Sequence, residues 1–324
     1  MPAAFRLIWM LVFSGLALAI AHANAQSYPT KPVRVIVPFP PGSGVDIVTR
    51  LVTPKLADGL GQQFVADNRA GAAGNIGAEV AARAAPDGYT LLMAAASIAI
   101  SQTLYRKLNY NLEKDFEPVA LVASAPFVLV VHPSLPAGNV KGLVALAKAK
   151  PGGLTYASTG NGSTPHLTTE IFKLQAGINL VHVPYKGTPP AVTDLIAGQV
   201  TMMFANTLSV LPHVNTGRLR ALAISSGKRS AAAPELPTVA ESGMPGFDTS
   251  TWFGMLAPAG TSKDVVARLS GELRKIVQLP DIRKQLISQG ADPVGTTAEQ
   301  FGAHLRAEIA KWGKAVKASG ARVD

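Results

Sequence analysis

The feature that most constrains the fold is a regular alternation of short apolar runs and helical patterns over the first hundred residues. Residues 33–37 are a β-branched run that ends at a Pro/Gly loop, as a buried strand would. Ser43 and Asp46 then stand in S-x-x-D spacing before apolar residues of helical period, which predicts a capped helix. Further strands are predicted over 64–66 and 89–94, with an alanine-rich helix between them. This β-α-β-α-β order indicates an open parallel sheet.

The same alternation returns beyond residue 120. Strands are predicted over 127–131, 154–157, 180–183, 200–204, 219–224 and 251–257. Helices are predicted over 140–149, 165–176 and 189–197, and amphipathic helix over most of 262–318. These patterns predict an α/β fold of two lobes, each a mostly parallel sheet flanked by helices, with two crossover strands near 120–130 and 249–257. We assign residues 26–123 and 248–324 to lobe 1, and residues 124–247 to lobe 2.

The first 25 residues have the pattern of a secretory signal peptide. Arg6 precedes an apolar run over 7–20, and Ala23-Asn24-Ala25 supplies an A-x-A cleavage site. That run is about 14 residues long, and about 20 are needed to span a membrane. We therefore expect cleavage after Ala25 and a periplasmic protein; the alternative is a retained membrane anchor.

Composition removes several function classes. The chain of 324 residues has no cysteine, which excludes disulfides, thiolate metal sites and cysteine nucleophiles. The formal net charge is +10, and one of the 30 basic residues is Arg6 in the predicted signal peptide. The remaining 29 basic and 20 acidic residues still leave an excess of +9. An exported protein has little access to nucleic acid, so this charge favours an attraction for small anions.

Glycine and hydroxyl residues follow three predicted strands, in the loops 40–44, 95–97 and 158–164. The first and third loops run straight into predicted helices, whose free backbone N–H groups and dipole can hold an anion without a charged side chain. The alternative is a set of ordinary capped turns. The candidate ligand-binding residues around these loops are Phe39, Pro41, Gly42, Ser43, Ser97, Ser158, Thr159, Gly160, Asn161, Ser163, Thr164, His166 in the first helical turn, and Lys186 after a later strand.

Motifs for catalysis or cofactors are missing from the sequence. No lysine follows the glycines as a phosphate-binding loop requires, and Gly160 and Gly162 lack the third glycine of a dinucleotide site. Neither G-x-S-x-G nor H-x-x-x-H occurs. We therefore expect no catalytic residue, no metal and no cofactor. A secreted hydrolase or lyase that uses His166 or Asp194 remains an alternative.

Nine separated blocks of sequence resemble the receptors of tripartite tricarboxylate transporters, also called Bug-type receptors. These blocks are 37–42, 68–69, 74–77, 85–91, 158–163, 182–187, 219–223, 237–241 and 252–254. The resemblance implies a type II periplasmic-receptor fold that closes on a small carboxylate, with no chemistry performed on it. It also implies delivery to integral membrane permease subunits by a receptor that we expect to be a monomer. In the family, loops like 41–44 and 158–164 contact the ligand through backbone groups, hydroxyls and water.

The sequence departs from the family pattern at polar positions. Ser43 replaces a second glycine, and Ile98 stands where a histidine is frequent, with Ser101-Gln102 in place of Asn-Pro. Thr201 and Ala205 replace aspartates, and Ala205 precedes Asn206, a further candidate ligand-binding residue. These changes favour a mono- or dicarboxylate over a tricarboxylate. A sensory partner that presents its ligand to a membrane kinase would share this fold and remains the other alternative.

Overall fold

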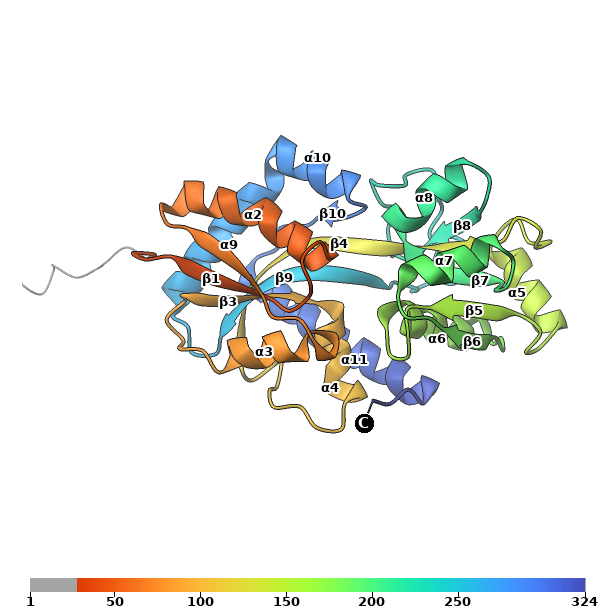
Figure 1. The fold of residues 1–324 in the computed structure, drawn as a ribbon, viewed down its shortest axis with the longest axis horizontal. Coiled ribbons are helices and arrows are strands. Elements are labelled where there is room, and N and C mark those ends of the chain that lie inside the picture. The colour runs from red at the N-terminus through yellow and green to blue at the C-terminus, as the bar shows by residue number, and fades with distance from the viewer. Residues whose placement is uncertain (1–27, 324) are drawn as a thin grey trace, which may run out of the picture.

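The computed structural model describes residues 28–323, so the predicted signal peptide lies outside the described residues. Two lobes of sheet and helix lie side by side, linked by β4 (Phe116–Val131) and β9 (Ser250–Pro258) (Figure 1). The other strands are β1 (Val33–Val37), β2 (Phe64–Asn68), β3 (Thr90–Ala95), β5 (Thr155–Ser158), β6 (Val181–Pro184), β7 (Met202–Asn206), β8 (Arg220–Ile224) and β10 (Asp292–Pro293). The helices are α2 (Gly44–Leu60), α3 (Asn75–Ala82), α4 (Ala96–Leu104), α5 (Val140–Ala149), α6 (Thr164–Ala176), α7 (Thr188–Ile196), α8 (Thr207–Asn215), α9 (Lys263–Gln278), α10 (Pro280–Ser288) and α11 (Ala298–Ser319). The predicted two-lobed α/β fold is confirmed.

The strand β4 belongs to both sheets. In lobe 1 the strand order is β2-β1-β3-β9-β4, and β1 runs parallel to both of its neighbours. β4 pairs with β9 up to Pro126, and from Phe127 onward it pairs with β7 and β8 of lobe 2. In lobe 2, β5 runs parallel to β6 and β7. The chain returns beside this crossing, where the Thr249 amide donates to the Ser225 carbonyl at 2.9 Å. Both crossover strands are thus where the sequence predicted them.

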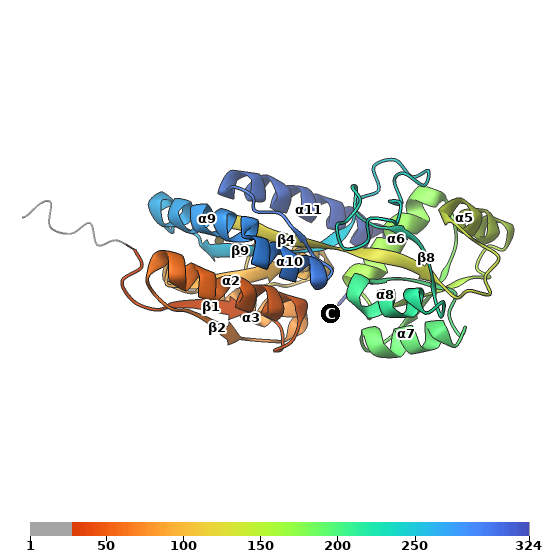
Figure 2. The same ribbon diagram turned by 90° about the horizontal axis from the view of Figure 1, so that it is seen from above.

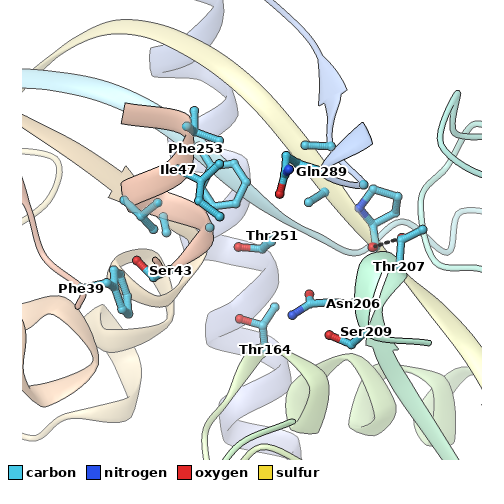
Figure 3. A pocket seen from close by; sticks show the side chains of 18 of the residues that line it. Phe39, Ser43, Ile47, Thr164, Asn206, Thr207, Ser209, Thr251, Phe253 and Gln289 are labelled. Atoms are coloured by element: carbon cyan, nitrogen blue, oxygen red, sulfur yellow. Dashed lines mark hydrogen bonds between the residues drawn. The ribbon is translucent and has the colours of Figure 1, made fainter. Parts of the chain in front are cut away.

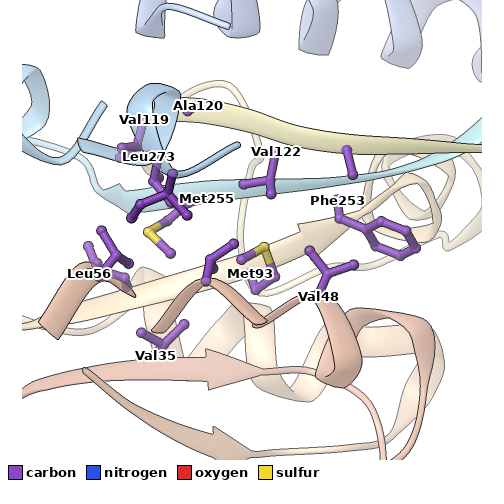
Figure 4. Close-up of a cluster of buried hydrophobic side chains, with 14 of the residues drawn as sticks. Val35, Val48, Leu56, Met93, Val119, Ala120, Val122, Phe253, Met255 and Leu273 are labelled. Carbon is purple, nitrogen blue, oxygen red and sulfur yellow. The ribbon is translucent and has the colours of Figure 1, made fainter. Parts of the chain in front are cut away.

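Helices cover both faces of the lobe 1 sheet, in which β2, β1 and β3 run parallel and β9 runs antiparallel to β3 and β4. On one face of the lobe 1 sheet, α2, α9 and α10 cover residues such as Val35 and Met93, shown in Figure 4. On the other face, α3, α4 and α11 cover Ile36 and Leu92. Neighbouring residues of β1 and β3 therefore enter opposite cores, because successive side chains of a strand point to opposite faces. Figure 1 shows the sheet between these two helical layers, and Figure 2 looks down on α2, α9 and α10 from above.

Helix α11 extends from lobe 1 toward lobe 2 and packs against α6 as well as α4. Its buried Glu308 accepts hydrogen bonds from the indole N–H groups of Trp252 at 2.9 Å and Trp312 at 2.7 Å. Lys311 donates to the Asp248 carbonyl at 3.1 Å, beside the point where the chain returns to lobe 1. These contacts fix the helix against the crossover.

Two helices, α4 and α8, were not predicted from the sequence. Residues 95–97 are not a loop, because β3 runs directly into α4, and Ser97 lies in the first helical turn. The helix α8 follows β7 in the same way, and Asn206 is its N-cap residue. No helix within residues 28–323 is both long and apolar enough to cross a membrane.

Candidate ligand-binding cleft

The two lobes enclose a cavity of about 430 Å³ beside the crossover strands. Residues of α2, β9 and the end of α10 line it from lobe 1, and residues of α6 and α8 line it from lobe 2. A neighbouring compartment of about 680 Å³ shares six lining residues with this cavity. The shared residues are Phe39, Ser43, Ser97, Thr164, Asn206 and Thr251. Every described residue that lines either compartment is uncharged.

Polar and apolar side chains occupy different ends of the cavity. Figure 3 shows Ile47 and Phe253 on the lobe 1 side, and Thr164, Asn206 and Ser209 together on the lobe 2 side. The hydroxyl of Thr251 lies between these groups, Ser43 lies beside Phe39 on the lobe 1 side, and Gln289 approaches from the end of α10. The cavity can therefore contact both a polar and an apolar part of one ligand.

Several helices begin at the cleft, and among them α4 and α8, which begin at the cavity of about 430 Å³, lack a side-chain cap. Ala95 and Asn206, the N-cap residues of α4 and α8, make no capping hydrogen bond, and neither helix has an acidic residue in its first turn. By contrast, Ser43 and Ser163 cap α2 and α6. The first amides of an uncapped helix still need acceptors. The uncapped ends of α4 and α8 can thus supply donors and a positive dipole end to an anion in the cavity.

The hydroxyl of Ser97 lies at the uncapped end of α4. Its Oγ atom is buried and has no hydrogen-bond partner among residues 28–323. Ser97 also lines both compartments of the cleft. A buried hydroxyl without a partner costs roughly 1–3 kcal/mol, so a ligand acceptor here would relieve an existing penalty.

The loop before α2 is held by an ionised carboxylate. Asp46 accepts hydrogen bonds from the Gly42 amide at 2.9 Å, from Arg50 Nε at 2.9 Å and from Asn68 Nδ2 at 3.0 Å. Burial alone would raise the pKa of Asp46, but these hydrogen bonds outweigh it and lower the pKa. Asn68 also donates to the Phe39 carbonyl at 2.9 Å. The network therefore fixes the loop that carries Phe39, Gly42 and Ser43 to the cleft.

The loop 158–163 before α6 satisfies most of its own amides. Ser158 Oγ accepts from Gly160 at 3.1 Å, His166 Nδ1 accepts from Gly162 at 3.0 Å, and the Ser163 amide donates to the Gly160 carbonyl at 3.2 Å. Fewer amides are left for an anion here than the glycine-rich sequence suggested. A Cβ atom at Gly162 would lie 2.4 Å from Leu104 of α4, so glycine permits this loop to approach the opposite lobe.

The structure brings most of the predicted site residues to the cleft. The candidates that line it are Phe39, Gly42, Ser43, Ser97, Thr159, Asn161, Ser163, Thr164 and Asn206. Four others do not line it: Pro41 and Lys186 are exposed, Ser158 is buried, and Gly160 is half-buried.

His166 does not face the cleft, contrary to the prediction. It lines a separate cavity of about 450 Å³ on the other side of the loop 158–163. Its ring stacks on that of His182 with centroids 4.1 Å apart, and His182 stacks on Tyr156 at 4.7 Å. The hydrogen bond from Gly162 to Nδ1 turns the ring toward these neighbours, because it ties the imidazole back to its own loop.

His166, His182, Tyr156, Glu170 and Lys173 form what we call the histidine cluster. The Tyr156 hydroxyl donates to Glu170 at 2.5 Å, Lys173 donates to Glu170 at 2.7 Å, and His182 Nε2 lies 2.6 Å from Ser158 Oγ. Burial and then the neighbouring His166 lower the pKa of His182 to about 4. Burial also lowers the pKa of His166, against the opposing effect of Glu170. Both rings are therefore neutral at pH 7.

Sequence reasoning missed the apolar wall of the cavity and the hydroxyls of α8. Ile47 and Val48 lie one turn inside α2, Thr251 and Phe253 lie on β9, and Ser209 and Thr207 begin α8. Thr207 also donates to the Pro126 carbonyl at 3.3 Å, which ties α8 to the part of β4 that passes from lobe 1 to lobe 2. Thr251 and Phe253 are two residues apart on a strand, so they lie on the same face of the sheet. This spacing is the one sign in the sequence that they belong together.

Known proteins of similar sequence and structure match nearly the whole chain. The sequence model of the family described as tripartite tricarboxylate transporter family receptor matches residues 48–321. The protein BugT of Bordetella pertussis is 39% identical over 314 residues, which cover 96% of each chain.

Two similar solved structures come from Rhodopseudomonas palustris, one with adipate and one with bound malate. Rpa4515 with adipate is 37% identical, has a TM-score of 0.77, and is matched over 91% of this chain and 100% of its own. MatC with bound malate is 31% identical, has a TM-score of 0.73, and is matched over 89% of this chain and 100% of its own. With the family match and the shared fold, the resemblance found in the sequence is confirmed: the chain belongs to the tripartite tricarboxylate transporter receptor family, whose members are periplasmic transporter receptors.

Proposed function

We propose that this protein binds a small carboxylate in the cleft between its lobes and delivers it to a membrane permease. The observation that carries the proposal is the pair of uncapped helix ends, α4 and α8, at one uncharged cavity. Backbone N–H groups and hydroxyls there can satisfy the oxygens of a carboxylate. We propose that the protein acts in the periplasm after cleavage behind Ala25, as a monomer.

An uncharged site suits a receptor that must release its ligand. Helix ends contribute about 0.3–1 kcal/mol each when exposed, and up to about 2 kcal/mol when partly buried. Exclusion of water when the lobes close would strengthen each of these hydrogen bonds, since the local dielectric falls. Two such ends supply up to about 4 kcal/mol, so hydrogen bonds from hydroxyl groups and apolar contacts must add to them. Reopening of the lobes weakens the same contacts.

The relatives support a carboxylate as the ligand. Rpa4515 is described with adipate and MatC with malate, and both are similar to this chain over nearly its full length. The two histidines near the loop 158–163 lie in the histidine cluster and pair with other side chains there. We therefore propose a receptor in preference to a hydrolase or lyase.

A thermal-shift series of matched acids and amides tests this proposal. Hexanoate and hexanamide differ in charge but have nearly the same shape, as do benzoate and benzamide. A ligand present at 100 times its Kd stabilises the folded state by about 2.7 kcal/mol. We expect at least one carboxylate in a wider panel to raise the melting temperature while its amide does not. If no carboxylate does so, or if the amides act equally, the proposal is wrong.

A further inference from the structure

The distribution of polar groups in the cavity suggests what the rest of the ligand is like, provided that the proposed function holds. We infer that the ligand is a monocarboxylate with an uncharged, apolar body, an aliphatic or aromatic acid and not a diacid. Its carboxylate lies at the lobe 2 end, near Thr164, Asn206 and Ser209. Its apolar body lies at the lobe 1 end, against Ile47 and Phe253.

The lobe 2 end can receive one carboxylate. Asn206 caps nothing with its side chain, so its amide group and the first amides of α8 are available together. No hydrogen bond within residues 28–323 engages the side-chain oxygens of Thr164 or Ser209. These donors lie on one side of the cavity, in Figure 3, and Ser97 adds its unpartnered hydroxyl from α4.

The lobe 1 end has little to offer a second carboxylate. At the start of α2, the Gly42 amide already donates to the ionised Asp46, and the Ser43 amide donates to the Pro40 carbonyl at 3.2 Å. The ring of Phe253 lies against Gly44, where an added Cβ would stand 3.2 Å from its Cζ atom. No hydrogen bond within residues 28–323 engages the first amides of α2, at Gly44 and Val45, so it is the Phe253 ring beside Gly44 that limits the room for an anion there.

A helix of the opposite polarity also ends here. The last residue before the C-cap of α10 is Ser288, and the next three residues, Gln289 to Ala291, line the cavity. The C-terminal end of a helix carries the negative pole of its dipole and repels a second carboxylate. Gln289 and Ser43 are neutral polar groups like those at the lobe 2 end, and the negative pole of α10 beside them makes an uncharged body the more favourable occupant.

The apolar wall of the cavity, formed by Ile47, Val48 and Phe253, instead favours an apolar ligand body. Ile47 is half-buried in the cleft, and Val48 and Phe253 are 2% and 6% exposed beside it. Burial of apolar surface against such a wall is favourable in proportion to its area. A second carboxylate would instead lose its hydration without finding a partner, which is costly.

Calorimetric titration of the mature protein, residues 26–324, with ligands matched in length tests the inference. Hexanoate and adipate share a six-carbon chain, and benzoate and terephthalate share a ring, but one of each pair carries a second carboxylate. We expect the monocarboxylate of at least one pair to bind tenfold or more tightly than its diacid. If both diacids bind as tightly or more tightly, this inference is wrong while the proposed function stands. If no carboxylate binds, both are wrong.

A charge introduced into the apolar wall provides a second test. Ile47→Arg would place a cation at the lobe 1 end, and we expect it to weaken hexanoate binding and strengthen adipate binding, which reverses their order. Val65→Arg makes the same change of charge at an exposed position of β2, 53% accessible and outside the cleft. That control should keep the wild-type order. Unchanged preference in a folded Ile47→Arg variant would contradict the inference, and the wild-type ranking tests it even if this variant does not fold.

Discussion

The cleft and the histidine cluster lie on opposite sides of the same loop, 158–163, but their polar groups are used differently. In the cluster, Tyr156, Glu170 and Lys173 pair with one another, and both histidines bond to the loop. In the cleft, the Ser97 hydroxyl and the first turns of α4 and α8 have no side-chain partner within the described chain. Polar groups that are already paired stabilise the fold, whereas those left open are available to a ligand. Mutations in the two regions should therefore have different effects.

The largest effect on stability is expected in the cluster. Glu170→Ala removes the acceptor of both Tyr156 and Lys173 and leaves a half-buried cation without its partner. Breaking a buried pair in this way costs about 3 kcal/mol. Chemical denaturation should show this loss, while ligand affinity of the folded variant changes less than threefold. A variant of normal stability that no longer binds would place the cluster in the binding site.

Acidification should act through the same cluster. The pKa of His182 is lowered to about 4 in the folded protein, from an ordinary value of 6.5, so the unfolded chain binds more protons between these values. Stability should be complete above pH 6.5 and fall as the pH drops toward 4. Glu170 raises and Lys173 lowers the pKa of both rings.

Thermal melts between pH 7 and pH 5 measure this effect, and His182→Gln should flatten the profile. The cleft has no charged lining residue, so the affinity for a carboxylate that stays ionised should change little between pH 8 and pH 6.5. A steep change of affinity over that range, without a change in stability, would contradict the separation of the two regions.

A smaller effect, of opposite sign for stability and binding, is expected at Ser97. Ser97→Ala removes a buried hydroxyl that has no partner, so stability should rise by about 1 kcal/mol while affinity falls about tenfold. Thr168→Val is the matched control, because Thr168 also has a buried, unpartnered hydroxyl but lies outside the cleft. It should raise stability and leave affinity unchanged. If the two variants have equal affinity for the ligand, Ser97 does not belong to the binding site.

The same contrast explains what the sequence could and could not predict. The strands and most helices were predictable because their apolar residues follow the periods of 2 and 3.6 that burial imposes. The helices α2 and α6 were predictable because Ser43 and Ser163 cap them. The helices α4 and α8 have no capping residue and their apolar residues follow directly on those of the strands before them, so the sequence does not mark where they begin. Helix α7 also lacks a side-chain cap, but Pro189 marked its start. The missing caps of α4 and α8 also leave their first amides open. A capping residue in the sequence therefore marks those helices whose first amides already have a hydrogen-bond acceptor.

The orientation of His166 could not be predicted for a different reason. Its place in the first turn of α6 is local information, but its direction depends on His182 of β6 and Tyr156 of β5. The apolar wall likewise joins Ile47 to Phe253, about two hundred residues further along the chain. A single sequence does not indicate which distant strand lies beside which helix.

The most direct test of the account is to close the uncapped end of α8 without disturbing its shape. Asn206→Asp is nearly isosteric, and aspartate is a good N-cap residue, so it should hold or raise stability by up to about 1 kcal/mol. The same carboxylate would occupy the anion site. Asn215→Asp makes an equal change of charge at the exposed far end of the helix.

Calorimetric titration of both variants with the tightest carboxylate from the thermal-shift panel then gives the answer. We predict that Asn206→Asp loses at least a hundredfold in affinity while Asn215→Asp binds like the wild type. Equal affinity of the two variants would show that the carboxylate does not bind at α8, and would contradict the account.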